Sequence, residues 1–257
     1  TSGGVSGSRL GFKGTEDLGG GLKANFLLEE GIDLTSGAAA GFNRQAYVGL
    51  SGGFGEVKFG NVYTAYDDIS GATNPVFDSV LAPTNVWASS GYVGNPSNGI
   101  YYASPAMGGV SGAFSTNLKE GSGNQSNAFH VKYEGGPVYA GVAYQVDKTA
   151  AGDTKFTRVN GSYDLGAAKL LAGYGNVKAG SVKTTDLSFG ADVPLGANLV
   201  LSAGYASSKT DGAERLSGLG LGVAYSLSKR TTVYGGFLDT KNTGPDTRYG
   251  FGLKHTF

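Results

Sequence analysis

Few residues in this chain could carry covalent chemistry. It has no cysteine and two histidines, His130 and His255, and neither histidine has a nucleophile and an orienting carboxylate in a motif around it. A hydrolase needs those three groups together, and a zinc site needs more histidine or cysteine ligands than these two. The sequence therefore predicts no enzyme, no metal site and no cofactor.

The charged residues are better suited to act on ions through their electric field. Arg9 and Lys13 share one face of the first alternating segment, and Lys58 lies on the polar face of a later one. Charged side chains that surround a narrow passage set its ion selectivity. The alternative is that they are ordinary solvated charges, each of which contributes little.

The longest connector, residues 63–99, holds the carboxylates that would face this basic wall. It has 37 residues, and a loop of that length is usually functional. It carries Asp67, Asp68 and Asp78, so a positive wall opposite a negative loop would produce a transverse field. Trp87 on the same loop could contact sugars, although a lone loop tryptophan more often packs its loop against a wall.

The elements that must position these side chains are β-strands. Apolar and polar residues alternate along most of the chain, as Leu219, Leu221 and Val223 alternate with glycines, which is typical of strands with one apolar face. We predict fifteen strands, at 8–16, 22–31, 42–51, 56–63, 100–105, 109–118, 126–134, 137–147, 154–165, 169–177, 183–193, 199–208, 216–227, 231–239 and 247–257.

The connectors and the two strand faces indicate a membrane barrel rather than a soluble sandwich. Short turns alternate with longer polar loops, as in an outer-membrane meander. The polar face is rich in Gly, Ser, Lys and Asp, whereas the apolar face often has an aromatic residue near a strand end, as in interfacial girdles. Such aromatic residues are Tyr133, Tyr144, Tyr163, Tyr174, Tyr205, Tyr225 and Phe257.

Composition and strand number narrow the class further. No apolar run approaches the ~18 residues that a membrane helix needs. With 20 Lys+Arg against 20 Asp+Glu, nucleic acid is not an expected partner. Bacterial barrels have an even number of strands, so we expect sixteen, with the first one missing ahead of the fifteen visible. Residues 1–257 would form one antiparallel meander barrel domain with its last residue at the periplasmic end.

Four strings resemble the Gram-negative general porins of the neisserial and β-proteobacterial type. They are SRLGFKGTEDLGGGLKANFLLEEG (8–31), FNRQAYVGLSGGFGEVKFGNVYTAYDD (42–68), NGIYYASPAMGG (98–109) and YGFGLKHTF (249–257). The resemblance implies a 16-stranded barrel, a homotrimer with one pore per protomer, and a third loop folded into the lumen. It also implies that the alternation ending in Phe257 is a signal for the barrel assembly machinery.

The resemblance adds particular expectations for the pore. Arg44 matches the family's lumenal arginine, so we place it on the basic wall. Tyr101 stands where many relatives have an arginine, and Val76 replaces the family's glutamate in the third loop. Lys132 and Arg158 also face the polar side of their strands, either as a second basic strip or as scattered solvated charges.

We therefore interpret the chain as a passive diffusion channel in the outer membrane of a Gram-negative bacterium. Small hydrophilic solutes and ions would cross it, with a weak preference for anions, and lipopolysaccharide and other outer-membrane lipids would surround it. One alternative is a solute-specific channel with a stacking track formed by Trp87, Tyr92, Tyr101 and Tyr102. An alternative from another class is a surface β adhesin.

Overall fold

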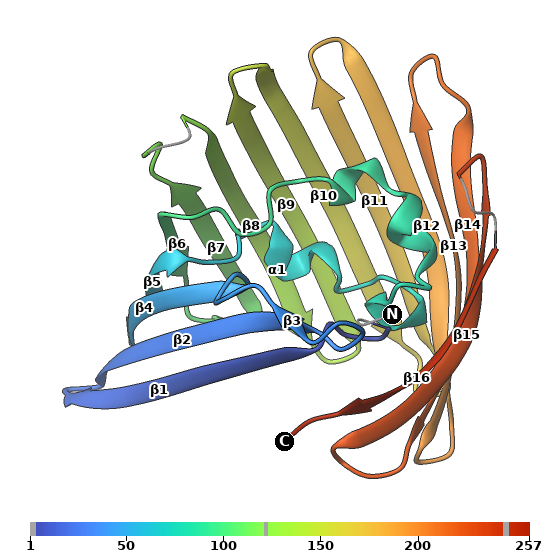
Figure 1. Cartoon of the computed structure of the whole chain (residues 1–257), viewed down its shortest axis with the longest axis horizontal. Helices are drawn as coiled ribbons and strands as arrows, with labels where there is room; N and C mark the ends of the chain where they lie inside the picture. The colour runs from blue at the N-terminus through green and yellow to red at the C-terminus, as the bar shows by residue number, and fades with distance from the viewer. Residues whose placement is uncertain (1–3, 121–122, 244–246) are drawn as a thin grey trace.

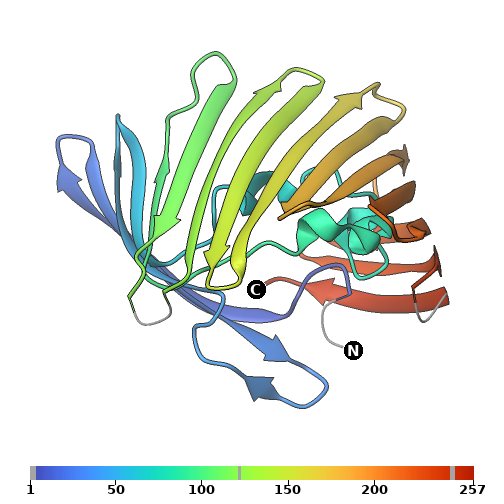
Figure 2. The ribbon, with the colours of Figure 1, turned by 90° about the horizontal axis from the view of Figure 1, so that it is seen from above.

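The chain folds into a curved wall of antiparallel strands around a lumen (Figures 1 and 2). This computed structural model describes residues 4–120, 123–243 and 247–257. The wall strands are β1 (Arg9–Gly19), β2 (Leu22–Asp33), β4 (Gln45–Gly52), β5 (Gly55–Asn61), β6 (Gly99–Ala103), β7 (Val110–Asn117), β8 (Gln125–Gly135), β9 (Val138–Thr149), β10 (Gly152–Asp164), β11 (Lys169–Ala179), β12 (Val182–Leu195), β13 (Leu199–Thr210), β14 (Arg215–Ser226), β15 (Thr231–Lys241) and β16 (Thr247–His255).

Each wall strand pairs antiparallel with the next along the chain, so the predicted meander is confirmed. The two-residue strand β3 (Ala38–Ala39) pairs with β2 off this path. In the described part of the chain, β1 and β16 are the two edges of the wall (Figure 1). The fifteen wall strands match the fifteen predicted segments, and a sixteenth wall strand stays a prediction.

The two ends of the wall differ in their connections. At one end, the turn end, short connections join pairs such as β1–β2 and β8–β9. At the other, the loop end, the predicted loops 148–153 and 178–182 are much shorter than expected, because β9 to β12 extend through them and leave only 150–151 and 180–181 as turns. Polar residues that lie in water beyond the membrane can still continue the hydrogen-bond ladder of a sheet. Their polarity therefore did not mark the ends of the strands.

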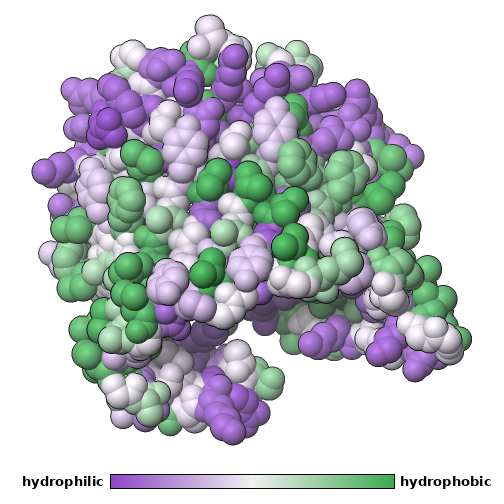
Figure 3. Space-filling model, turned by 180° about the vertical axis from the view of Figure 1, so that it is seen from behind, coloured by the Kyte–Doolittle hydropathy of each residue, from purple (hydrophilic) through white to green (hydrophobic). Residues whose placement is uncertain are grey.

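The outward face of the wall carries large apolar side chains that no other part of the chain covers. Phe189 is 62% exposed, Leu219 is 51% exposed and Phe129 is 46% exposed. Figure 3 shows this outer face, with hydrophobic residues below a hydrophilic upper rim. The apolar rows have the character of a lipid-facing surface.

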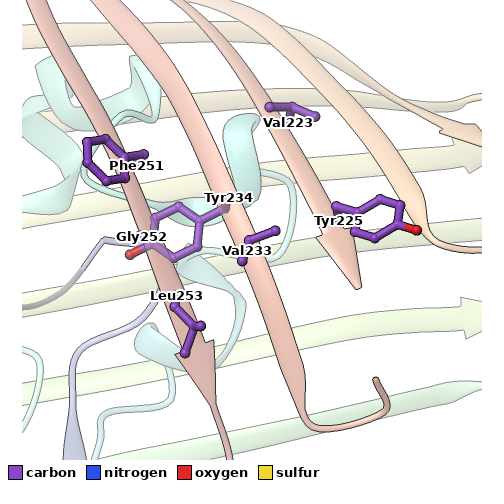
Figure 4. Close-up of a pocket in the computed structure, with 7 residues that line it drawn as sticks. All are labelled: Val223, Tyr225, Val233, Tyr234, Phe251, Gly252 and Leu253. Atoms are coloured by element: carbon purple, nitrogen blue, oxygen red, sulfur yellow. The ribbon is translucent and has the colours of Figure 1, made fainter. Parts of the chain in front are cut away.

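An apolar depression of about 410 Å³ lies in the wall at β14, β15 and β16 (Figure 4). Five of its seven lining residues belong to the outward rows, namely Val223, Tyr225, Val233, Phe251 and Leu253. The other two are Tyr234 and Gly252. Its lining offers little to a polar solute, so the candidate site lies elsewhere, in the lumen.

The connection between β5 and β6, residues 62–98, folds inside the wall, and we call it the lumen loop (Figures 1 and 2). It contains the short helices α1 (Asp67–Ser70), η1 (Val76–Asp78), η2 (Pro83–Val86) and η3 (Ala88–Ser90), which the sequence did not predict. They pack against β8 to β15, so the predicted lumenal fold of the third loop is confirmed.

None of the helices in the described ranges is long and apolar enough to cross a membrane.

Lumenal glycines let the loop lie directly on the wall. A Cβ atom on Gly190 or Gly204 would stand 2.5 or 2.4 Å from atoms of Pro75, and one on Gly222 would stand 2.7 Å from Val76 Cγ1. Real Cβ atoms essentially never approach so closely, so a side chain at these positions would displace the loop. The lumenal glycines of β12, β13 and β14 thus form the surface on which this part of the loop rests.

The two faces of β8 provide a direct test of orientation. Val131 is 46% exposed on the outward row, and Lys132 lies next to it on the lumenal row. We expect Val131→Arg to destabilise the folded barrel in lipid by about 2–4 kcal/mol, because it places a charge in hydrocarbon. Lys132→Gln should be nearly neutral. Equal stabilities in a urea titration of the two refolded variants would contradict the assigned faces.

Candidate functional site

Arg158 on β10 holds the lumen loop to the wall from beneath. Its side chain is 1% exposed, and its guanidinium donates to the Ser70 carbonyl oxygen and to the Ser89 and Ser90 hydroxyl oxygens, the last two at 3.2 and 3.3 Å. The guanidinium carbon also lies 4.9 Å from the centre of the Trp87 ring. A single side chain thus joins α1 to η3.

A buried carboxylate on β12 completes this contact. Asp186 is fully buried, and its Oδ2 accepts the Ser89 backbone N–H at 2.7 Å. Ser89 therefore touches the cation through its hydroxyl group and the anion through its amide. A buried charge is stable only when opposite charge and hydrogen bonds offset its lost hydration. The segment at Ser89 gives Arg158 an acceptor and one Asp186 oxygen a donor, so loop docking and charge burial depend on each other.

Further hydrogen bonds fasten the rest of the loop along the wall. Asn160 donates to the Ile69 carbonyl oxygen at 2.6 Å, and the Ser202 hydroxyl oxygen accepts the Val76 N–H at 2.8 Å. The Trp87 indole N–H donates to the Leu187 carbonyl oxygen at 3.2 Å. The loop is therefore attached to β10, β12 and β13, and its other side is turned toward β1 to β5.

These contacts correct the sequence analysis at two positions. Trp87 is 5% exposed and Arg158 is 1% exposed, so neither side chain lines open lumen. Trp87 packs the loop against the wall, and Arg158 lies on the lumenal row of β10 but is covered by the loop. Period-two alternation gives the face of a residue, but it does not show what a distant loop places over that face.

Arg44 lies just before β4 and not inside it, contrary to the predicted strand 42–51. Its backbone N–H donates to the Glu29 carbonyl oxygen, and its Nε lies 2.7 Å from Glu29 Oε1. Arg9 NH1 lies 3.8 Å from the same Oε1, so two cations share one carboxylate on the lumenal row of β2. Val48, which has the same parity as Arg44, is 63% exposed on the outward face, so the alternation along β4 does not extend to Arg44.

Lys58 occupies the next part of this wall, as a lumenal residue of β5. Its Nζ lies 3.0 Å from Glu56 Oε2 and about 5 Å from the ring centres of Tyr47 (5.1 Å) and Tyr101 (5.0 Å). Lys13 lies on the same lumenal face, opposite Leu27 of β2. The predicted basic side chains thus occur on one wall, with lumenal carboxylates between them.

The sequence analysis missed those two carboxylates. Glu29 and Glu56 lie on lumenal rows, and each contacts a predicted cation. Alternation along β2 and β5 could have identified both glutamates as lumenal. Each glutamate lies an even number of residues from another polar lumenal residue on its strand, and such residues share a face. The predicted basic wall included only its cations. Glu29 and Glu56 offset part of that charge, so the wall is less positive than predicted.

The three loop aspartates have different surroundings. The Tyr92 hydroxyl donates to Asp67 Oδ1 at 2.5 Å, and burial raises the pKa of Asp67 to about 6 against the lowering effect of this bond. The Tyr101 hydroxyl donates to Asp68 Oδ2 at 2.6 Å, and burial also raises the pKa of Asp68. Asp78 is exposed and accepts a hydrogen bond from Asn74 at 2.6 Å.

The predicted aromatic stacking track does not form. Tyr102 lies on the outward face and donates to the Phe54 carbonyl oxygen, because its neighbour Tyr101 takes the lumenal row. Tyr101 is 8% exposed and Trp87 is 5% exposed, so both rings are covered. His130 is 4% exposed, with its Nδ1 at 2.7 Å from the Ala65 carbonyl oxygen, which is a packing role.

The wall, the inward loop and the facing charges agree with what the comparisons with known proteins show. Residues 1–245 match the family described as Gram-negative porin. This chain belongs to the Gram-negative porins. The porin is 34% identical to outer membrane porin protein 32 of Delftia acidovorans over 95% of this chain and 77% of that protein. It is 30% identical to the major outer membrane protein P.IB of Neisseria lactamica, over 98% of this chain and 83% of the relative.

A solved structure has the same architecture. The anion-selective porin from Comamonas acidovorans superposes with a TM-score of 0.87 and 28% identity, covering 99% of this chain and 90% of that one. The porin is therefore an outer-membrane channel for passive diffusion and not an enzyme, as the sequence analysis predicted.

Removal of Arg158 should release the loop from the wall. Arg158→Met leaves the Ser70 carbonyl oxygen and the Ser89 and Ser90 hydroxyl oxygens without their buried donor, which we expect to cost about 1–3 kcal/mol and to broaden the distribution of single-channel conductances. The outward neighbour Thr157→Met is the matched control, and Arg158→Lys retains the charge if the methionine variant does not refold. A sharp wild-type conductance in Arg158→Met would contradict the anchoring role.

The raised pKa of Asp67 predicts a pH-dependent pore. As the pH falls from 7.5 to 5, Asp67 passes through its pKa of about 6 and loses its negative charge. The zero-current potential in a salt gradient should shift toward anions, with a midpoint near that pH. Asp67→Asn should remove most of the shift, whereas Asp78→Asn, which loses an exposed carboxylate, should retain it. A shift of equal size in both variants would contradict the assignment.

Proposed function

We propose that ions and small hydrophilic solutes cross this porin between the lumen loop and the wall formed by β1, β2, β4 and β5. The observation that carries the proposal is the asymmetric attachment of the loop. Its hydrogen bonds to wall strands fall on β6 to β13, whereas Arg9, Arg44 and Lys58 stand on the opposite wall. On that side the loop is bonded only next to β4 among the described residues, where Asn95 donates to the carbonyl oxygens of Asn43 and Arg44. The passage is therefore the space that the loop leaves beside the cations.

The charges on the two sides support a weak preference for anions. Glu29 neutralises one of the two arginines that share it, and Glu56 is paired with Lys58. In the described part of the chain, this leaves one arginine and Lys13 without an ion-paired carboxylate on the wall. On the loop, Asp67 is partly buried, and Asp67 and Asp68 each accept a hydrogen bond from a tyrosine, which weakens their field in the passage. The similar Comamonas acidovorans porin is described as anion-selective.

The mechanism needs no energy coupling. Basic groups on one side and carboxylates on the other set up a field across the passage, which orients dipolar solutes and favours counter-ions. Each contact is with a hydrated side chain and is weak, so a solute can leave as readily as it enters. The size limit follows from the position at which the wall holds the loop.

We also propose the assembly and membrane partners that the resemblance implies. They are two further copies of the chain in a homotrimer, lipopolysaccharide in the outer leaflet, and the barrel assembly machinery, which would read the C-terminal alternation and Phe257. The ring of Phe257 is fully exposed and contacts that of His255. Conductance steps that arrive three at a time in a planar bilayer would support the homotrimer, and single steps would oppose it.

The selectivity proposal is tested by removing the shared arginine charges. We expect Arg9→Gln combined with Arg44→Gln to lower the chloride-to-potassium permeability ratio by about thirtyfold, since each of the two charges contributes about 1 kcal/mol at close range in water. Lys254→Gln, on the lumenal row near the turn end, is the control and should change the ratio little. An unchanged ratio in the double variant would contradict the proposed passage.

A further inference from the structure

Two large apolar side chains interrupt the polar lumenal surface of β1, β2, β4 and β5. Leu27 on β2 is directly opposite Tyr47 on β4, and both lie on lumenal rows. The other lumenal positions of these four strands carry polar or charged side chains or glycine. We call Leu27 and Tyr47 the apolar step.

Leu27 departs from the alternation that the rest of β2 follows. It lies between Phe26 and Leu28, which both belong to the outward row, so three large apolar residues are consecutive. On the lumenal row its neighbours along the strand are Asn25 and Glu29. An apolar side chain in such a row stands beside water unless another group covers it, and covering it is favourable.

The lumen loop does not provide that cover in full. Its helices pack mainly against β8 to β15, on the other side of the lumen from β1 and β2 (Figure 2). Tyr47 packs at the margin of the buried cluster that includes Tyr66 and Tyr101, and Leu27 is not part of that cluster. Both side chains of the apolar step are half-buried, so part of each surface faces the lumen.

A cation stands on each side of the apolar step. Lys13 on β1 is directly opposite Leu27, it is exposed, and it has no ion-paired carboxylate among the described residues. On the other side, the Lys58 ammonium lies 5.1 Å from the centre of the Tyr47 ring and is paired with Glu56. Lys13 is therefore the cation that remains available to an anionic solute at the step.

The apolar step lies on the passage proposed above, beyond the arginines. Lys13 follows Arg9 by four residues on the lumenal row of β1, which at about 3.3 Å per residue is roughly 13 Å toward the turn end. Glu29, which Arg9 and Arg44 share, precedes Leu27 by two residues in the same direction. An anion that has passed the arginines therefore meets Lys13 and the apolar step next.

The chemistry of the row selects among solutes. Sites for small molecules combine apolar and aromatic side chains with a few polar groups that fix orientation. An inorganic anion would use Lys13 alone. A sugar would place hydroxyl groups against Leu27, where they find no hydrogen-bond partner. A flat ring with one carboxylate uses all three side chains, because neighbouring strands are about 4.8 Å apart and an aromatic ring covers about that width.

We propose that the apolar step binds small aromatic carboxylates as they cross the pore. The carboxylate faces the Lys13 ammonium, and the ring lies on Leu27 and against Tyr47. The contact area is small and open to water, so binding is weak and the solute can leave again. The inference names a solute class for the proposed passage and rests on that passage.

The test compares solutes that share either the charge or the ring. Chloride current through the full-length protein in a planar bilayer is measured at neutral pH while benzoate, acetate or benzamide is added. We expect the benzoate concentration that halves the current to be at least tenfold below that of acetate. Benzamide should not block at that concentration. Equal half-blocking concentrations for benzoate and acetate, or for benzoate and benzamide, would overturn the proposal.

A pair of variants assigns the preference to the step. Leu27→Asn should raise the half-blocking concentration of benzoate at least fivefold and bring it close to that of acetate. Thr15→Asn, which adds the same amide to the lumenal row of β1 two residues from Lys13, is the matched control and should keep the wild-type preference. An equal loss of preference in both variants would overturn the assignment.

The charge has its own pair of variants, which also serves if Leu27→Asn does not refold. Lys13→Gln should weaken the block by benzoate at least fivefold. Lys23→Gln removes a charge from the lumenal row of β2 near the turn end and should leave the block at its wild-type value. A wild-type benzoate block in Lys13→Gln would overturn the proposal.

The selectivity measurement separates this inference from the proposed function. If the combined Arg9 and Arg44 variant loses chloride preference as expected and the wild type does not distinguish benzoate from acetate, the apolar step is wrong and the passage stands. If that variant keeps its chloride preference while Leu27→Asn loses the preference for benzoate, the role given to the arginines is wrong and the apolar step stands.

Discussion

The guanidinium of Arg158 and the carboxylate of Asp186 are buried beneath a loop that reaches them from across the lumen, and the rest of the pore depends on this arrangement. Neither charge would be stable in a dry wall without the Ser89 segment between them. The loop also packs apolar side chains on the wall, among them Tyr66, Ile69 and Val76, which are almost fully buried. Charge burial and loop docking therefore stabilise each other, and the width of the passage follows from where they meet.

The second requirement is that the wall allows the lumen loop to approach it closely. Glycines at lumenal positions of β12, β13 and β14 remove the side chains that would keep the loop away, as Gly190 and Gly204 do beneath Pro75. On the opposite wall the lumenal rows keep their charged side chains. The wall thus has a glycine-rich half, against which the loop packs, and a half with charged lumenal side chains, which faces the solute. This division, rather than any single residue, produces a field across the passage.

Much of the fold could be predicted because each wall strand obeys one local rule. A residue's face follows from its parity, so the strand number, the meander and the lumenal row of Arg9 all follow from alternation. Three-dimensional contacts between distant segments obey no such rule. The burial of Trp87 and Arg158 depends on a loop that crosses the lumen, and the position of Arg44 depends on where β4 begins. The outward orientation of Tyr102 could have been predicted, because adjacent residues on a strand point to opposite faces and Tyr101 is lumenal.

The absence of native cysteine allows the central claim to be tested directly by cysteine accessibility. Single-channel current is recorded through Arg9→Cys and through Ser188→Cys while a bulky, charged methanethiosulfonate reagent is added. Arg9 stands on the wall that the loop leaves free, and Ser188, 1% exposed, lies on the wall that it covers. The account predicts a stepwise fall in current for Arg9→Cys and no reaction for Ser188→Cys. Block of Ser188→Cys with an unreactive Arg9→Cys would place the passage on the other side of the loop and contradict the account.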